Sequence, residues 1–259
     1  MTTAEPLAED VPPRAGGVQS VDRALDLLEV LAAADVPVGV SELAARTRLP
    51  EGTAHRLLRA LVHRGYVAQN SDRKYALGTA ALVLGEASNR SLARQAQPYL
   101  RQLVDISGET ANLAVLDGDR VVYVAQAPSP RRLRMFAEVG RSVHAHSTAV
   151  GKVLVAALPQ GAVEALLDRV GQPRRTGATL VDRDAFLADL ELTRQRGWGL
   201  DDGEEEEGVR CLALPVSARG RTVAAVSVSG PAERLPYGLL DDLAARLRVV
   251  VDAFAESLG

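Results

Sequence analysis

The 259-residue chain has a single cysteine, Cys211, and no long uninterrupted apolar run. One cysteine excludes an intramolecular disulfide and fits a reducing compartment. No apolar stretch approaches the roughly eighteen residues that a membrane-spanning helix needs. Residues 1–17 carry acids, prolines and glycines but neither the basic start nor the apolar block of a secretory signal. We therefore expect a disordered tail at 1–17 and a cytoplasmic protein without a membrane partner.

Familiar catalytic motifs are also missing. The chain has no G-x-S-x-G, H-E-x-x-H or G-x-x-x-x-G-K-[ST], and "GWGLDDG" misses G-x-G-x-x-G by one residue. One enzyme alternative stays open, in which Cys211 is a nucleophile and His144 or His146 its base. The same histidines with Asp201 or Cys211 could hold zinc, but histidines two apart are commoner as ordinary strand residues. We expect no catalysis, no metal and no cofactor.

Positive charge is concentrated in one short segment. Residues 46–74 hold seven Lys or Arg against two acids, a net charge of +5, whereas residues 91–259 hold twenty basic and twenty-two acidic residues, a net of −2. The whole chain has a formal net charge of −3. A local positive segment in a chain that is otherwise not basic indicates a local anionic partner, such as a phosphate backbone.

The same segment has the local signals of three helices and a hairpin. Ser20 and Ser41 are plausible N-caps for the first two helices. Pro50 suits the start of a third helix, and Gly65 suits its end. "YVAQ" and "RKYAL" then read as two short strands around a turn. Together these elements describe a winged helix-turn-helix.

The third helix presents two different faces. Its alanine and leucines recur at the i, i+3, i+4, i+7 spacing, and its arginines lie opposite them. Arginine suits guanine or phosphate, and recognition helices use their first turns for base edges. A solvated amphipathic helix is the plainer alternative. We expect the following DNA contacts: bases from Gly52, Thr53, His55 and Arg56, and phosphates from Arg59, Arg73 and Lys74.

The rest of the chain reads as an α+β domain. Helices are expected at 79–89, 92–106, 147–158, 161–169, 182–196 and 235–257. The runs "TANLAVL" and "RVVYVAQA" flank an Asp-Gly turn, and strands at 208–217 and 221–229 form a second hairpin. The helix at 79–89 is expected to pack against its own copy or against the second domain. We expect a winged helix-turn-helix at 18–78, a linker helix at 79–90 and a second domain at 91–259.

Three blocks in order resemble the IclR family of bacterial transcriptional regulators. They are "ELAARTRLPEGTAHRLLRALVHRGYV", "HSTAVGKVLVAAL" and "RGWGLDDGEEEEGVRCLALPV", and the resemblance runs from about Val18 onward. It implies a homodimer or homotetramer that binds double-stranded operator DNA, more often as a repressor. It also implies a C-terminal GAF-like effector-binding domain for a small carboxylate such as glyoxylate, pyruvate, an allantoin-pathway acid or an aromatic acid.

The resemblance also implies which positions line the effector pocket. Position by position, they are Met135, Val143, Ala149, Val150, Asp201, Val209, Cys211, Ser227 and Ser229. One position departs from the family pattern, because Gly203 stands where relatives usually carry the first glutamate after Asp-Asp.

Local chemistry supports a pocket independently of the resemblance. Ser147 can cap a helix whose first N–H groups favour an anion, and Ser227 and Ser229 share one face of a strand. Alternatively, the serines face solvent, Cys211 is packing, and Glu204–Glu207 are a solvated loop.

Overall fold

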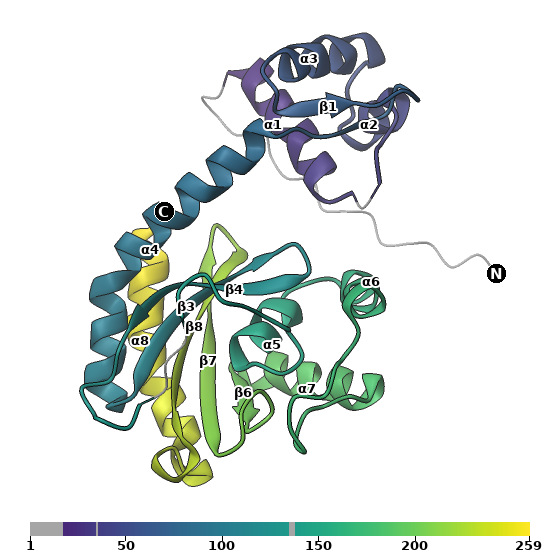
Figure 1. Cartoon of the computed structure of the whole chain (residues 1–259). Coiled ribbons are helices and arrows are strands. Elements are labelled where there is room, and N and C mark those ends of the chain that lie inside the picture. The colour runs from purple at the N-terminus through teal and green to yellow at the C-terminus, as the bar shows by residue number, and fades with distance from the viewer. Residues whose placement is uncertain (1–17, 35, 135–137) are drawn as a thin grey trace, which may run out of the picture. The chain divides into compact units, whose positions relative to one another are not determined.

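The computed structural model describes residues 18–34, 36–134 and 138–259. The predicted tail at 1–17 and the predicted pocket residue Met135 lie outside the described residues. The chain divides into two compact units, the first ending at Ser88 and the second running from Asn89 to Gly259, and each is described by itself (Figure 1).

The first unit is the predicted winged helix-turn-helix. Its elements are α1 (Gln19–Ala32), α2 (Val40–Arg46), α3 (Glu51–His63), β1 (Val67–Gln69) and β2 (Tyr75–Leu77). Its core gathers the apolar faces of the three helices around Leu27, Leu43 and Leu58, all fully buried. An isolated bridge between Val38 and Tyr75 ties the segment before α2 to the second strand of the wing. The i, i+3, i+4, i+7 spacing of α3 therefore identified its two buried residues, Ala54 and Leu58, correctly.

The predicted serine caps are wrong for both early helices. Helix α1 has Val18 as its N-cap residue and α2 has Gly39, and neither side chain makes a capping hydrogen bond. Both N-cap residues have an extended backbone, which is the conformation this position needs, so each helix begins one residue before its serine. Pro50 precedes α3 as its N-cap residue. Gly65 takes a φ of +75° just after the helix, as predicted for its end.

Two predicted helices are a single one. The segments expected at 79–89 and 92–106 form one continuous 28-residue helix, α4 (Ala80–Ser107). The intervening Asn89, Arg90 and Ser91 include two weak helix formers. A weak propensity over two residues is easily overridden within a long helix, so the break expected from the sequence does not occur. The domain boundaries at 78 and 90 stay a prediction.

A six-stranded antiparallel sheet forms the centre of the second unit. Its strands are β3 (Thr110–Asp117), β4 (Arg120–Ala127), β5 (Ser142–Val143), β6 (Gly199–Asp202), β7 (Val209–Ala218) and β8 (Arg221–Pro231). Their spatial order is β5-β4-β3-β8-β7-β6. The two hairpins, β3–β4 and β7–β8, were predicted. The edge strands β5 and β6 were missed because two and four residues are too short to show an alternating pattern.

Helices cover both faces of this sheet (Figure 1). They are α5 (Ala149–Ala156), α6 (Gln160–Val170), α7 (Arg183–Arg196) and α8 (Leu240–Ser257), and short 3-10 turns at Ala232–Arg234 and Tyr237–Leu239 precede α8. One core joins a sheet face to α4 and α8, and the other joins the opposite face to α5, α6 and α7. This arrangement confirms the α+β prediction. Within the described ranges, no helix is both long and apolar enough to cross a bilayer.

Candidate functional site

The first candidate site is the exposed face of α3. Ala54 and Leu58 are buried on one side of this helix, whereas Gly52, Arg56 and Arg59 are exposed on the other. His55 is exposed and Thr53 half-buried. In the part of the chain that the structure describes, no carboxylate pairs with Arg56 or Arg59. The guanidinium groups therefore remain available to an external anion.

Gly52 is the smallest residue on this face and lies in the first turn. A Cβ placed on Gly52 would meet no atom of the protein within 4 Å. The fold itself therefore does not need glycine at this position, although glycine in a helix costs about 0.5–1 kcal/mol relative to alanine. A close approach by something outside the chain would explain the residue.

The wing hairpin exposes the other two predicted basic contacts. Arg73 and Lys74 lie between β1 and β2 and are both exposed. Asn70 closes this turn, because its Oδ1 accepts hydrogen bonds from the N–H groups of Asp72 (3.1 Å) and Lys74 (2.9 Å). Arg73 takes a φ of +59°, which is uncommon for a residue other than glycine. The turn thus holds two basic side chains on a short, hydrogen-bonded tip.

The second candidate site is a small cavity in the second unit. Five of the predicted effector positions lie on its wall. These are Val143, Asp201, Val209, Cys211 and Ser229. They come from β5, β6, β7 and β8, so residues 86 positions apart in the sequence meet here. The cavity volume is about 30 Å³.

Asp201 and Cys211 face one another across neighbouring strands. They are directly paired in the β6–β7 register. Burial raises the pKa of the Asp201 carboxyl to about 7, and burial followed by the charge of Asp201 raises the pKa of the Cys211 thiol well above its usual value. Asp202 points to the other side of β6 and pairs with Arg210 at 2.6 Å. A neutral thiol beside a carboxyl suits a binding wall rather than a nucleophile.

The predicted serines are both buried, so the alternative that they face solvent is wrong. Ser229 lines the cavity, and its Oγ accepts a hydrogen bond from Asn112 Nδ2 at 3.5 Å. Ser227 shares that face of β8 two residues earlier but is not among the residues that line the cavity. Ala149 and Val150 are buried in the first turn of α5 and likewise do not line it. Their roles stay predictions.

The cap of α5 differs from the prediction by one residue. Thr148, not Ser147, is the N-cap residue, and its Oγ1 accepts a hydrogen bond from the Gly151 N–H at 3.3 Å. Ser147 instead donates through Oγ to the Glu205 Oε2 atom at 2.7 Å. A serine next to a helix start has two uses for its hydroxyl, and only the folded loop decides between them.

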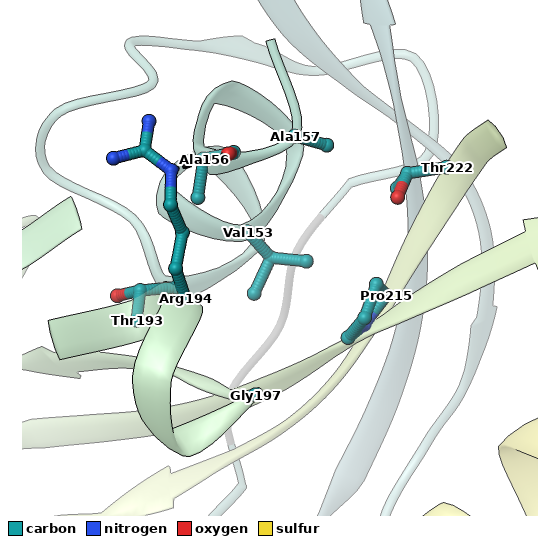
Figure 2. A pocket seen from close by; sticks show the side chains of 8 residues that line it. All are labelled: Val153, Ala156, Ala157, Thr193, Arg194, Gly197, Pro215 and Thr222. Atoms are coloured by element: carbon teal, nitrogen blue, oxygen red, sulfur yellow. Dashed lines mark hydrogen bonds between the residues drawn. The ribbon is translucent and has the colours of Figure 1, made fainter. Parts of the chain in front are cut away.

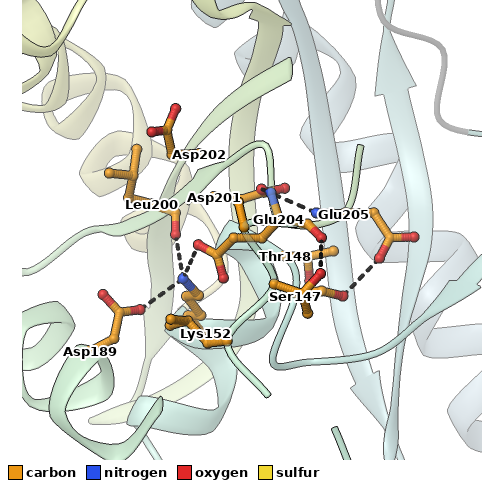
Figure 3. Close-up of polar contacts among 12 residues, drawn as sticks. Ser147, Thr148, Lys152, Asp189, Leu200, Asp201, Asp202, Glu204 and Glu205 are labelled. Carbon is orange, nitrogen blue, oxygen red and sulfur yellow. Dashed lines mark hydrogen bonds and ion pairs between the residues drawn. The ribbon is translucent and has the colours of Figure 1, made fainter. Parts of the chain in front are cut away.

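The acidic run is not a solvated loop along its whole length. Figure 3 shows the Lys152 ammonium surrounded by acceptors: Glu204 Oε1 at 2.5 Å, Asp189 Oδ2 at 2.8 Å and the Leu200 carbonyl at 2.8 Å. Lys152 is only 1% exposed. Burial raises the pKa of the Glu204 carboxyl, and the charge of Lys152 opposes that shift. Gly203, with a φ of +74°, allows the backbone turn that brings Glu204 inward.

The two histidines are engaged away from Cys211. His144 Nε2 lies 2.6 Å from Arg120 Nη1, and His146 Nε2 lies 3.1 Å from the Pro173 carbonyl. Burial lowers the pKa of both imidazoles, and the positive charge of Arg120 lowers that of His144 further. Among the described residues, no cluster of three His, Cys, Asp or Glu side chains could hold a metal ion.

A larger cavity of about 200 Å³ lies between α5, α7 and the strands β7 and β8 (Figure 2). None of the predicted site residues lines it. Its walls are Val153, Ala156, Ala157, Thr193, Arg194, Gly197, Pro215 and Thr222. The Arg194 Nε atom donates to the Ala156 carbonyl at 2.8 Å, so its charged group is already used within the fold. Of these two cavities, only the smaller one is lined by predicted effector positions.

The sequence missed several residues of the smaller cavity. These are Asn112, Tyr123, Arg141, Thr148, Glu205 and Glu206. Asn112 pairs with Ser227 in the β3–β8 register, so the pairing of these two strands is the signal that identifies it. The acidic run could have drawn attention to Glu205, but only the fold shows that Glu204 contacts Lys152 while Glu205 and Glu206 line the cavity.

Comparisons with known proteins agree with this architecture. The model of the IclR helix-turn-helix domain matches residues 20–71, and the model described as "Bacterial transcriptional regulator IclR C-terminal" matches residues 85–255. The transcriptional repressor IclR of Escherichia coli (strain K12) is 38% identical over 229 residues, covering 86% of this chain and 84% of the relative.

Solved structures show the same fold. The IclR protein of Thermotoga maritima is 25% identical, with a TM-score of 0.63, covering 93% of this chain and 99% of that one. An IclR homologue from Microbacterium hydrocarbonoxydans, in complex with 4-hydroxybenzoate, is 22% identical, with a TM-score of 0.60, covering 92% and 99%. The relatives are transcriptional regulators, not enzymes. The chain therefore belongs to the IclR family of bacterial transcriptional regulators.

Proposed function

We propose that this regulator is a repressor that binds operator DNA through α3 and the wing and that responds to a small carboxylate in the second unit. The observation that carries the DNA part is the exposed face of α3, where Arg56 and Arg59 lie opposite the buried Ala54 and Leu58. A helix of this kind enters the major groove with its first turn against base edges. Because bacterial DNA lies in the cytoplasm, the protein acts there.

We divide the proposed DNA contacts into base contacts and phosphate contacts by their position on α3 and the wing. Gly52, Thr53, His55 and Arg56 lie in the first two turns of α3 and contact bases. Arg59, one turn further along, contacts phosphate, as do Arg73 and Lys74 on the wing tip. Phosphate contacts fix the position of the protein on the duplex, whereas base contacts determine sequence preference.

Exposed apolar side chains at the start of α4 support a homodimer or homotetramer. Leu82 is 68% exposed, and Val83 and Leu84 are similarly open. Pairing with a second copy would bury them, and the dimer would then fix the spacing of the two operator half-sites at about 34 Å or a multiple of it. Sedimentation of the full chain measures this assembly, and a monomer at every concentration would contradict it.

The small cavity is the proposed effector site. Asp201, Cys211 and Ser229 supply polar groups, and Val143 and Val209 supply apolar walls. Met135, Ala149, Val150 and Ser227 complete the site by the family pattern. The M. hydrocarbonoxydans relative carries an aromatic carboxylate, which is one of the classes expected here. A coupling of about 1–3 kcal/mol between effector and DNA changes operator affinity about 5- to 150-fold.

Replacing single basic residues tests the DNA part. Arg56→Ala should weaken binding to the protein's own promoter by about 1–3 kcal/mol and relax sequence preference. Arg73→Ala should weaken binding to all sequences alike and reduce the dependence of affinity on salt. Fluorescence anisotropy with promoter and scrambled duplexes at several salt concentrations separates the two effects. Unchanged promoter binding by Arg56→Ala would show that α3 is oriented differently.

A further inference from the structure

The effector cavity already contains a carboxylate that belongs to the chain itself. Glu205 lines the cavity, and its side chain is 14% exposed. Its Oε2 atom accepts a hydrogen bond from Ser147 Oγ at 2.7 Å, its Oε1 atom lies 3.2 Å from Arg141 Nη2, and its Oε2 atom lies 3.5 Å from Arg175 Nε. One hydroxyl and two guanidinium groups therefore surround this carboxylate, as they would surround a bound carboxylic acid.

The position of these donors favours a carboxylate, whether it belongs to the chain or to a bound molecule. Ser147 immediately precedes Thr148, the N-cap residue of α5, so the positive end of that helix lies beside the carboxylate (Figure 3). Arg141 and Arg175 are 42% and 47% exposed and can be reached from solvent. If Glu205 turned away, two positive charges and a hydroxyl would be left without their present partner.

Glu205 and an external acid would use the same donors. Because Ser147 Oγ, Arg141 Nη2 and Arg175 Nε all contact the Glu205 carboxylate, an external carboxylate can take these contacts only after Glu205 has left them. The neighbouring Glu204 holds the same loop through its own ion pair with Lys152. Rotation of the Glu205 side chain can therefore open the cavity while the loop stays attached to α5.

We propose that Glu205 is a built-in competitor of the effector, and that Arg141, Arg175 and Ser147 recognise the carboxylate of a small carboxylic acid after displacing Glu205. The inference rests on the proposed effector function and specifies its chemistry. A site that is blocked most of the time binds its ligand more weakly, in proportion to the fraction of molecules in which it is open. Glu205 therefore tunes the protein to high concentrations of its metabolite.

Calorimetric titration with sodium acetate, the simplest analogue of a glutamate side chain, tests the competition. Glu205→Gln removes the negative charge and keeps the size of the side chain, and it should lower the Kd for acetate about tenfold or more. Glu207→Gln is the matched control. Glu207 is exposed in the same loop and does not line the cavity, so the same change of charge there should leave the Kd for acetate within about twofold of the parent.

Two further variants make the assignment specific. Glu205→Ala should also bind acetate more tightly than the parent. Agreement between the two variants would show that the effect comes from losing the carboxylate and not from the glutamine side chain. Combining Glu205→Gln with Arg141→Met should cancel the gain, because the ligand then loses a guanidinium partner. Circular dichroism melts of each variant check that the second unit is folded.

Several outcomes would overturn the inference. Equal Kd values for the parent and for folded Glu205→Gln would show that Glu205 does not compete. An equal fall in the Kd for acetate in Glu207→Gln would show that the effect comes from net charge alone. If no variant bound acetate, the proposed anion site would be wrong. Promoter binding without acetate is measured separately by anisotropy. If the parent protein does not bind its promoter, the proposed DNA function is contradicted, but the acetate result still stands.

Discussion

The two units use charge in opposite ways. On α3 of the first unit, Arg56 and Arg59 are exposed and lie opposite a buried apolar face. In the second unit, Lys152 is buried between Glu204 and Asp189. A charge in water costs little and stays available to a partner, whereas a buried charge is tolerated only with its own partners. The exposed set therefore suits recognition, and the buried set holds α5, α7 and the acidic loop together.

Removing the buried cation is the strongest test of this comparison. Lys152→Met should lower the free energy of unfolding by about 3–5 kcal/mol, because two carboxylates would be left in a buried site without compensation. Arg59→Met is the matched control at the exposed face and should change the same quantity by less than about 0.5 kcal/mol. Urea denaturation followed by circular dichroism measures both. Equal effects would remove the distinction between the two sets of charges.

The buried carboxyl of Asp201 predicts a pH dependence. Its pKa of about 7 in the folded protein exceeds the value of about 3.9 in an unfolded chain. The folded state therefore keeps a proton that the unfolded state has lost, so this contribution to stability is complete below about pH 4 and disappears as the pH rises through about 7.

Asp201→Asn isolates that contribution, because the amide oxygen can still accept the Glu204 N–H that Asp201 Oδ1 accepts at 2.7 Å. Relative to the parent, this variant should gain on the order of 2–4 kcal/mol in free energy of unfolding between pH 4 and pH 8. Denaturation series across this range provide the measurement. If the difference between the two proteins does not change with pH, the carboxyl is ionised in the fold and its burial is compensated.

The smallest expected effect concerns Gly52 on the exposed face. Gly52→Ala should raise the free energy of unfolding of the first unit by about 0.5–1 kcal/mol, since alanine favours the helix and meets no neighbouring atom. The same methyl group should weaken promoter binding, because it fills the space that we assign to DNA. Thermal melts and anisotropy on one preparation give both values. A more stable variant with unchanged promoter affinity would place Gly52 away from the duplex.

Local patterns in the sequence determined most of the fold. The leucine spacing of α3 needs only neighbours along one helix, and the Asp-Gly turn between β3 and β4 needs only four residues. Such signals do not depend on distant parts of the chain. They failed where two local choices are nearly equal in energy, as for Ser147 and Thr148 at the start of α5, or where an element is too short, as for β5.

The proposed effector site likewise has a part that the sequence indicated and a part that only the fold shows. The sequence, through its family pattern, indicated Asp201, Cys211 and Ser229 as members of one pocket, and the strand register brings them together. Only the tertiary structure decided that Glu205 turns toward Arg141 and Arg175, because these three side chains come from segments 30 to 64 residues apart. Coulomb attraction depends on distance in space, and no spacing along the chain reveals which of four glutamates approaches two arginines.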